Sequence, residues 1–385
     1  MGPRVVPSFF HQSLTARNRN VIMPSSQELL LELQHIVDRP IRVMVVCGTH
    51  NRAILRYDLR ERLPHNLELV AGPGCTVCVM PSGHIDAFVK IAKQPDVITT
   101  TCEDLLQVRG TRESLASIRA QGALVEVIST PRESLAIAEA NPGKIIVYPA
   151  VGFEATAPGI AEVILDAASR GIDNFCVIPS IRLLPPTLDS LLADPHLNID
   201  GLLCSDHINS LSDTEAYTTL AQKHHLACCI AGFEQEDILR CLLNMVRQIK
   251  SGVSQVDNLS AVVYSSEEYR KAKKMVAEVF FAVDTIWRGI GIIEESGFVI
   301  RDELSLYDAT KRFNVRLPDE EIHCQCICGM IMSGLGLPPD CPDFGKACTI
   351  EHPIGPCMLS FEGICASYYN YTLEHGIPAV QPLHG

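Results

Sequence analysis

Apolar runs of strand length alternate with stretches of helical spacing along residues 26–250 of this 385-residue chain. The apolar runs are continuous, and they occupy residues 41–47, 66–72, 96–101, 144–151, 174–180, 199–204 and 225–231. Helical spacing marks residues 25–39, where a serine is placed to cap the first turn, and also 84–94, 113–122, 132–143 and 158–171. Continuous apolar strands separated by helices predict an α/β fold, with parallel sheets covered on both faces.

Polar and sulfur-containing side chains gather where the predicted strands end. They are Cys47 and His50, Cys75 and Cys78, Asp104, Glu154, His207 and Glu234. In parallel sheets, ligands bind at the carboxyl ends of the strands. The pattern therefore predicts a cleft lined by these residues.

The pattern changes near residue 252. Residues 268–290 predict one long helix, and Gly, Pro and Cys then become frequent. We predict a first α/β domain with an N-terminal extension over 1–142, a second α/β domain over 143–252, and a helical, Cys-rich domain over 253–385. Two Rossmann-like parallel-sheet domains would then flank a cleft, with the Cys-rich domain at the C-terminus.

Composition narrows the function classes. Hydrophobic residues make up 47% and charged residues 20% of the chain, as in a packed globular protein. The formal net charge of −13 argues against a nucleic acid or an anionic membrane as partner. With no targeting signal or membrane-length apolar run, we expect a soluble, cytoplasmic protein. Its 16 cysteines then point to metal or redox chemistry rather than to a disulfide framework.

Seven cysteines gather in the C-terminal region: Cys324, Cys326, Cys328, Cys341, Cys348, Cys357 and Cys365. Four thiolates bind either tetrahedral zinc or an iron–sulfur cluster. A zinc ribbon usually carries two C-x2-C knuckles, and this region has none. The irregular, Gly- and Pro-rich spacing favours an iron–sulfur cluster, with zinc and simple reduced thiols as the alternatives.

Two cysteine motifs lie in the first half of the chain. Cys75 and Cys78 form a C-x-x-C pair beside α/β units, which favours thiol–disulfide chemistry. A pair of half-buried cysteines in a turn, or half of a zinc site, are the alternatives. In CGTH, Cys47 and His50 share one short turn, which suits a transition metal or a nucleophile with its base.

Two carboxylates accompany these motifs, each with a simpler explanation. Asp104 follows the third predicted strand, where aspartate commonly caps a helix. Glu154 follows the fourth, where it would suit the first turn of a helix. Their position at strand ends also makes both of them candidate site residues.

Together these motifs resemble the HypD family of hydrogenase maturation factors. The resemblance rests on CGTHNRAI, GPGCTVCVMPSGHID, NPGKIIVYPAVGFEATAP, LLPPTLDSLL, AGFEQEDIL, WRGIGIIEESG and CPDFGKACTIEHPIGPCMLSFEGICASYYNY, in that order. It implies a redox-active scaffold that assembles the Fe(CN)2CO unit of [NiFe] hydrogenases, rather than a conventional enzyme. It also implies a HypC-type chaperone that shares the iron, a HypE-type cyanide donor, and a [4Fe–4S] cluster in the C-terminal part.

Several residues carry roles by this resemblance. Cys47 matches the iron-binding cysteine, with His50 beside it, and Cys75 and Cys78 match the redox dithiol. Asp104 matches the cleft aspartate, and Glu154 lies in the GFEAT motif as a further candidate catalytic residue. The matching cluster ligands are Cys328, Cys341, Cys348 and Cys365. Cys357 is excluded from this set, and Cys324 and Cys326 are not assigned.

The chain also departs from the family pattern, mostly around the predicted cleft. The departures are Asn51-Arg52, Thr76, the residues Cys102, Glu103, Leu105, Gln107 and Arg109 around Asp104, and Ser205-Asp206 before His207. A divergent HypD paralogue with an altered iron site is therefore one alternative. A cluster-dependent thiol–disulfide reductase and a zinc-bound interaction module are the others.

Overall fold

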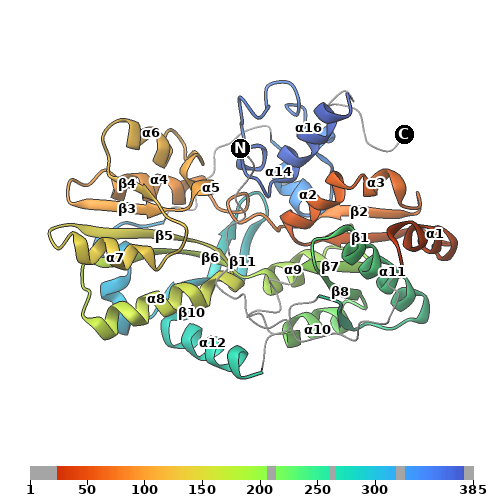
Figure 1. Cartoon of the computed structure of the whole chain (residues 1–385), viewed down its shortest axis with the longest axis horizontal. Helices are drawn as coiled ribbons and strands as arrows, with labels where there is room; N and C mark the ends of the chain where they lie inside the picture. The colour runs from red at the N-terminus through yellow and green to blue at the C-terminus, as the bar shows by residue number, and fades with distance from the viewer. Residues whose placement is uncertain (1–23, 206–213, 261–265, 318–325, 377–385) are drawn as a thin grey trace.

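The computed structural model describes residues 24–205, 214–260, 266–317 and 326–376 (Figure 1). Two sheets lie next to each other, and the C-terminal region covers one side of the molecule (Figure 1). The predicted α/β class and the seven predicted strands are confirmed. None of the helices in the described ranges is long and apolar enough to span a membrane.

The five-stranded sheet is parallel throughout. Its order is β2 (Leu67–Ala71), β1 (Ile41–Val45), β7 (Gly201–Ser205), β8 (Ala227–Ala231) and β9 (Val256–Asn258). Helices α1 (Ser26–Ile36) and α11 (Gln235–Ser251) pack on one face around an apolar cluster of their own. The expected serine cap is Ser25, which forms a capping box with Glu28.

The six-stranded sheet has the order β10 (Phe280–Trp287), β11 (Gly291–Ile300), β6 (Phe175–Arg182), β5 (Ile145–Phe153), β3 (Val97–Thr101) and β4 (Val125–Val127). It is parallel except where β11 pairs with β10 and β6. One face packs against α7 (Glu133–Ala140), α8 (Ala157–Arg170) and α12 (Ser266–Val279). The other packs against α4 (Ser82–Ala92) and α6 (Leu115–Ala120).

Two details differ from the sequence-based picture. The single helix expected over 268–290 is wrong, because α12 ends at Val279 and β10 begins at the next residue. The segment FFAVDTIW is rich in aromatic and β-branched residues, and pairing with β11 makes it a strand. The boundary expected at 142/143 passes through the six-stranded sheet, since β3 and β4 precede it and β5 and β6 follow it.

The C-terminal region consists of short elements. They are η3 (Asp302–Tyr307), α13 (Ala309–Arg312), α14 (Cys328–Met332), η4 (Pro338–Asp340), α15 (Pro356–Leu359) and α16 (Ile364–Glu374). From residue 326 onward this region packs over α2 (Gly48–Arg56) and joins the central apolar cluster between the sheets (Figure 1). The core is therefore shared by both sheets and the C-terminal region.

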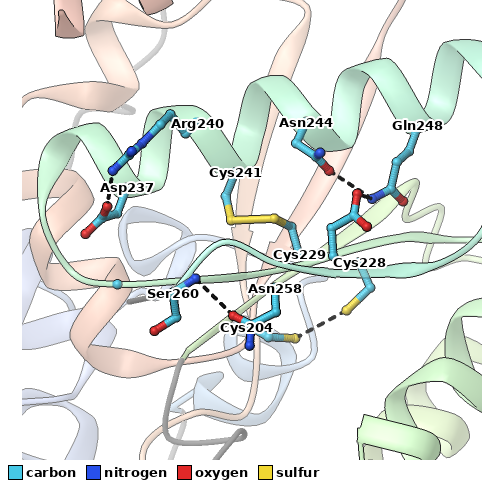
Figure 2. Close-up of a disulfide and its surroundings, with 12 residues drawn as sticks. Cys204, Cys228, Cys229, Asp237, Arg240, Cys241, Asn244, Gln248, Asn258 and Ser260 are labelled. Atoms are coloured by element: carbon cyan, nitrogen blue, oxygen red, sulfur yellow. Dashed lines mark hydrogen bonds and ion pairs between the residues drawn. A yellow bond between two sulfur atoms is a disulfide. The ribbon is translucent and has the colours of Figure 1, made fainter. Parts of the chain in front are cut away.

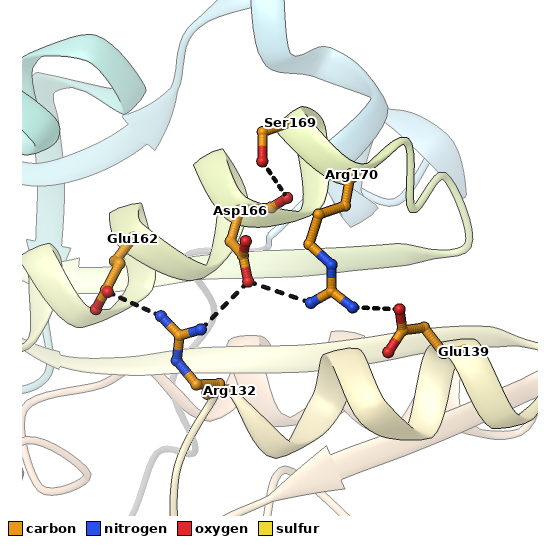
Figure 3. Close-up of polar contacts among 6 residues, drawn as sticks. All are labelled: Arg132, Glu139, Glu162, Asp166, Ser169 and Arg170. Carbon is orange, nitrogen blue, oxygen red and sulfur yellow. Dashed lines mark hydrogen bonds and ion pairs between the residues drawn. The ribbon is translucent and has the colours of Figure 1, made fainter.

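Short helices complete the connections: α3 (Leu59–Arg62), α5 (Glu103–Leu106), η1 (Glu154–Thr156), α9 (Leu184–Leu192) and α10 (Thr214–Lys223). On the outer surface, ion pairs join α7 to α8 (Figure 3). Arg132 pairs with Glu162 and Asp166, and Arg170 pairs with Asp166 and Glu139. Because these side chains are half-exposed, the network fixes the helix pair with only a small gain in stability.

Candidate functional site

A pocket of about 290 Å³ lies where the two sheets meet. The carboxyl ends of β1, β3, β5, β6 and β7 all contribute to its wall. Its lining comprises Val46, Cys47, Gly74, Thr76, Asp104, Val151, Gly152, Phe153, Glu154, Ala155, Thr156, Leu184, Ser205 and Glu362. The predicted cleft at the strand ends is therefore present, and three of the predicted residues, Cys47, Asp104 and Glu154, line it.

Cys47 follows β1 and precedes the first turn of α2. Burial raises the pKa of its thiol, and the nearby Glu362 carboxylate raises this pKa further. Three donors act in the opposite direction: the backbone N–H groups of His50 and Thr49 and the hydroxyl of Ser205. Burial therefore favours the protonated thiol of Cys47, while hydrogen-bond donors for a thiolate are already in place.

The loop that follows β2 approaches the backbone around Cys47 closely, and this approach depends on glycine. A Cβ on Gly74 would lie 1.8 Å from the Val46 carbonyl oxygen. The Gly74 carbonyl in turn accepts a hydrogen bond from the Gly48 N–H at 3.1 Å. These contacts bring the C-x-x-C loop next to Cys47.

Three carboxylates face the pocket. Glu154 accepts hydrogen bonds from the Leu184 N–H (2.9 Å) and from the Tyr217 hydroxyl (3.2 Å). Glu362 accepts one from the Thr49 hydroxyl at 3.3 Å. Burial raises the pKa of both Asp104 and Glu362, with nearby carboxylates as further causes. These carboxylates make the pocket wall acidic, although no three of the described Cys, His, Asp or Glu side chains converge as ligands of one metal ion.

Cys75 and Cys78 form a disulfide in the loop between β2 and α4, with their Cα atoms 5.2 Å apart. Both side chains are buried, while their neighbours Gly74 and Thr76 line the pocket. The two cysteines are thus close enough to each other for the predicted thiol–disulfide chemistry. Cys75 lies between these two lining residues, and Cys78 lies two residues beyond Thr76.

His50 is fully buried on α2 and is not among the pocket-lining residues. Its Nε2–H donates to the Gly232 carbonyl at 2.8 Å, and its ring lies 4.8 Å from the Phe233 ring. The side chain is therefore held by the loop between β8 and α11. The backbone N–H of His50, in contrast, donates a hydrogen bond to the Cys47 sulfur.

The described C-terminal cysteines lie in one region, and all but the half-buried Cys326 are buried. A hydrogen bond to Cys357 and burial raise the pKa of the Cys365 thiol well above its usual range, and Cys326 and Cys328 lie within electrostatic reach. The backbone N–H groups of Ile354 and Cys365 donate to the sulfurs of Cys348 and Cys357, each at 3.4 Å.

These donors fit an iron–sulfur cluster, because it needs several buried thiolates and N–H groups aimed at sulfur. Cys357, which the sequence-based assignment excluded, contacts Cys365. Within the described residues, no group of three or more Cys, His, Asp or Glu has the arrangement of a single-ion site. Thiols that surround a cluster of four irons stand farther apart than ligands of one ion.

Sequence reasoning missed two site residues. Glu362 lies in the segment between Cys357 and Cys365, and a Cβ on Gly48 would come within 2.4 Å of its carbonyl oxygen. Its position between two cysteines was the available signal. Ser205 departs from the family pattern, and its hydroxyl donates to Cys47. His207 and Cys324 lie outside the described residues.

A family model named HypD, described as "Hydrogenase formation hypA family", matches residues 25–372. The chain belongs to the HypD family. The HupD hydrogenase expression/formation protein of Azotobacter chroococcum is 37% identical over 340 residues, covering 86% of this chain and 90% of that protein. The hydrogenase maturation factor HypD of Escherichia coli is 36% identical over 352 residues, covering 90% and 94%.

A relative of lower identity is similar over a comparable length. The putative hydrogenase expression/formation protein of Methanocaldococcus jannaschii is 31% identical over 354 residues, covering 92% of this chain and 98% of that protein. The resemblance drawn from the motifs is therefore confirmed at the level of the family. All three relatives are named for hydrogenase formation or maturation.

Proposed function

We propose that this HypD-family chain is a redox-active scaffold that assembles the Fe(CN)2CO unit of [NiFe] hydrogenases. In this proposal a HypC-type chaperone shares the iron and a HypE-type protein donates the cyanide equivalents. The observation that carries the proposal is the pocket, because it combines one thiol, three carboxylates and an adjacent disulfide. Iron is the cargo of this site, and Cys47 is its proposed protein ligand.

Cys47 loses its proton when it binds the iron. The N–H groups of Thr49 and His50 and the hydroxyl of Ser205 then stabilise the thiolate by hydrogen bonds. Asp104 and Glu362, whose pKa values are raised, lie at the same pocket and can accept the released proton. Glu154 is held in place by Leu184 and Tyr217 and adds negative charge that favours a cation.

Cys75 and Cys78 supply the redox function in this proposal. Reduction of their disulfide consumes two electrons and two protons, and the reverse step returns them. Gly74 and Thr76, on either side of Cys75, line the pocket. Opening or closing of the disulfide therefore alters the position of residues in the pocket wall.

The proposed [4Fe–4S] cluster is held by Cys328, Cys341, Cys348 and Cys365, and when bound it supplies single electrons. Burial of these thiols and the N–H donors to sulfur support this assignment. The contact between Cys357 and Cys365 makes Cys357 the residue to test as a substitute ligand. Glu362 connects the C-terminal cysteine region to the pocket, because it lies between Cys357 and Cys365 in sequence and its side chain lines the pocket.

Complementation of hydrogenase maturation in a bacterium that lacks its own HypD tests the proposal. We expect the wild-type chain to restore hydrogenase activity when it is expressed with its HypC-type and HypE-type partners. Cys47→Ala, Cys75→Ser and Cys78→Ser should abolish the restored activity. Cys176→Ala is the matched control, because Cys176 is a buried free thiol outside the pocket lining.

Metal analysis of the anaerobically purified variants separates the individual roles. We expect about four irons with matching sulfide in the wild type and in Cys75→Ser and Cys78→Ser. Loss of sulfide in the latter two would contradict the redox assignment. About one zinc without sulfide would overturn the cluster.

Two further outcomes identify the alternatives. A wild-type chain with normal iron and sulfide that fails complementation would indicate a divergent paralogue. Turnover of a disulfide substrate without any partner protein would indicate a thiol–disulfide reductase, an alternative that the Cys75–Cys78 disulfide keeps open.

A further inference from the structure

Strand β8 carries two adjacent cysteines that face opposite sides of the five-stranded sheet (Figure 2). Cys228 faces the central apolar cluster, where its sulfur lies 3.7 Å from that of Cys204. Cys229 faces α11 and forms a disulfide with Cys241 on that helix (Figure 2). One strand therefore contributes to a thiol pair on one face and to a disulfide on the other.

The Cys229–Cys241 bond fits the surrounding backbone. The two Cα atoms are 5.7 Å apart, within the usual range of about 4.4–6.8 Å for disulfides. Both side chains are fully buried among the apolar residues between the sheet and α11. Neither lines the pocket, in contrast to the Cys75–Cys78 loop. A reductant in solution therefore reaches this bond only when α11 opens from the sheet.

The chain between the two cysteines includes the loop that holds His50. Gly232 accepts a hydrogen bond from His50 Nε2, and the Phe233 ring packs against the imidazole. On its other side, Gly232 lies close to Asp237 in the first turn of α11, where an added Cβ would come within 2.5 Å of Oδ2. Any shift of α11 along β8 would therefore move the support of His50.

We propose that Cys229 and Cys241 form a structural disulfide that fixes the β8–α11 loop and thereby positions His50 beside Cys47. Bond formation removes two electrons and two protons from the two thiols. A low-molecular-weight disulfide of the oxidised glutathione class accepts them by thiol–disulfide exchange, before α11 closes over the sheet. Unlike the Cys75–Cys78 pair, this bond stays closed in the working protein.

Peptide mapping tests the bond directly. The protein is denatured in acid, its free thiols are alkylated without reduction, and it is digested with trypsin. Cleavage after Lys223, Arg240 and Arg247 separates peptide 224–240, with Cys228 and Cys229, from peptide 241–247, with Cys241. We expect these two peptides to be joined, with one alkylated cysteine on 224–240.

Two other mapping results would overturn the proposal. The first is full alkylation of Cys229 and Cys241. The second is a link between 224–240 and 183–223, which would show that a cysteine of β8 is bonded to Cys204 instead of Cys241.

The melting temperatures of single and double variants distinguish a Cys229–Cys241 bond from two independent buried thiols. Cys229→Ala and Cys241→Ala should each lower the melting temperature by about 5 °C, and the double variant by a similar amount, because either change breaks the same bond. Two unconnected thiols would instead give additive losses, which would overturn the bond. Pairing Cys229→Ala with the control Cys176→Ala, another fully buried cysteine, should be additive.

Hydrogen exchange tests the positioning of His50. In the Cys229→Ala/Cys241→Ala variant we expect faster amide exchange in peptides that cover 232–236 and 48–52, with β3 and β4 unchanged. Unchanged exchange at 48–52, or faster exchange throughout the chain, would overturn the positioning role. This readout does not depend on iron, on the cluster or on any partner, so it stands apart from the proposed function.

Discussion

His84 is a buried imidazole outside the pocket lining. It lies on α4 with 4% of its surface exposed, and its Nδ1 is 3.1 Å from the Ser180 hydroxyl oxygen. Burial, together with the positive charge of Arg182, lowers the pKa of His84 well below its usual value of 6.5. The imidazole is therefore neutral in the folded protein at pH values at which the unfolded chain would protonate it.

This difference predicts a pH dependence of stability. Below about pH 6.5 the unfolded state binds a proton that the folded state does not, so the unfolding free energy falls as pH falls, by ~1.4 kcal/mol per unit. Between pH 7.0 and pH 5.0, His84→Gln should lose less unfolding free energy than the wild type, because the buried imidazole no longer favours the unfolded state at the lower pH. Urea unfolding at the two pH values measures this difference.

The control for this prediction is His65→Gln, because His65 is exposed. It should retain the pH dependence of the wild type. If the unfolding free energy falls equally between pH 7.0 and pH 5.0 in the His84 and His65 variants, burial of His84 does not cause the pH dependence.

Helix α8 shows how one residue type takes opposite roles within one element. Gly159 lies in its first turn, where an added Cβ would meet nothing within 4 Å. Gly171 ends the helix in the left-handed conformation, with φ of 66°. Alanine favours a helical backbone and disfavours the left-handed one.

The same substitution should therefore have opposite effects at the two positions. Gly159→Ala should raise the unfolding free energy by about 0.5 kcal/mol, because alanine loses less backbone entropy in a helix. Gly171→Ala should lower it by about 1 kcal/mol, because its side chain is strained at positive φ. Thermal melts of both variants measure the sign, and destabilisation of both would contradict this account of α8.

Local patterns predicted most of the elements. The Ser25 cap and the continuous apolar strands each depend on residues that are close in sequence. The helix predicted over residues 280–287 was wrong, because the apolar residues of this segment continue the helical spacing of α12. Only pairing with β11, a tertiary contact, makes it a strand.

At the scale of the whole molecule, the site depends on contacts between distant segments. The strand-end rule located Cys47, Asp104 and Glu154 because each follows a parallel strand. It did not locate Glu362, which reaches the pocket from the C-terminal region by packing against Gly48. The mixing of both halves of the chain in each sheet escaped prediction for the same reason, since strand order is not a local property.

The C-terminal region shares the central apolar cluster with both sheets, and two cation–π contacts also join it to α2 and α3. The guanidinium of Arg52 lies 3.4 Å from the centre of the Phe361 ring, and that of Arg60 lies 5.2 Å from the Tyr368 ring. Apart from α16, the helices between residues 326 and 376 have five residues or fewer. Such short helices provide little regular structure to hold the thiols of this region together. The proposed cluster would join them.

Removal of metal from the anaerobic protein should therefore loosen this region before the two sheets. After chelation, limited proteolysis should cut first within residues 326–376, while fragments that contain 24–260 persist. Because Glu362 also lines the pocket, Cys47 should react faster with iodoacetamide in the same sample. Mass spectrometry of the fragments and of alkylated Cys47 gives both readouts. An identical cleavage pattern before and after chelation would mean that packing alone holds the C-terminal region, and the cluster would then have no structural role.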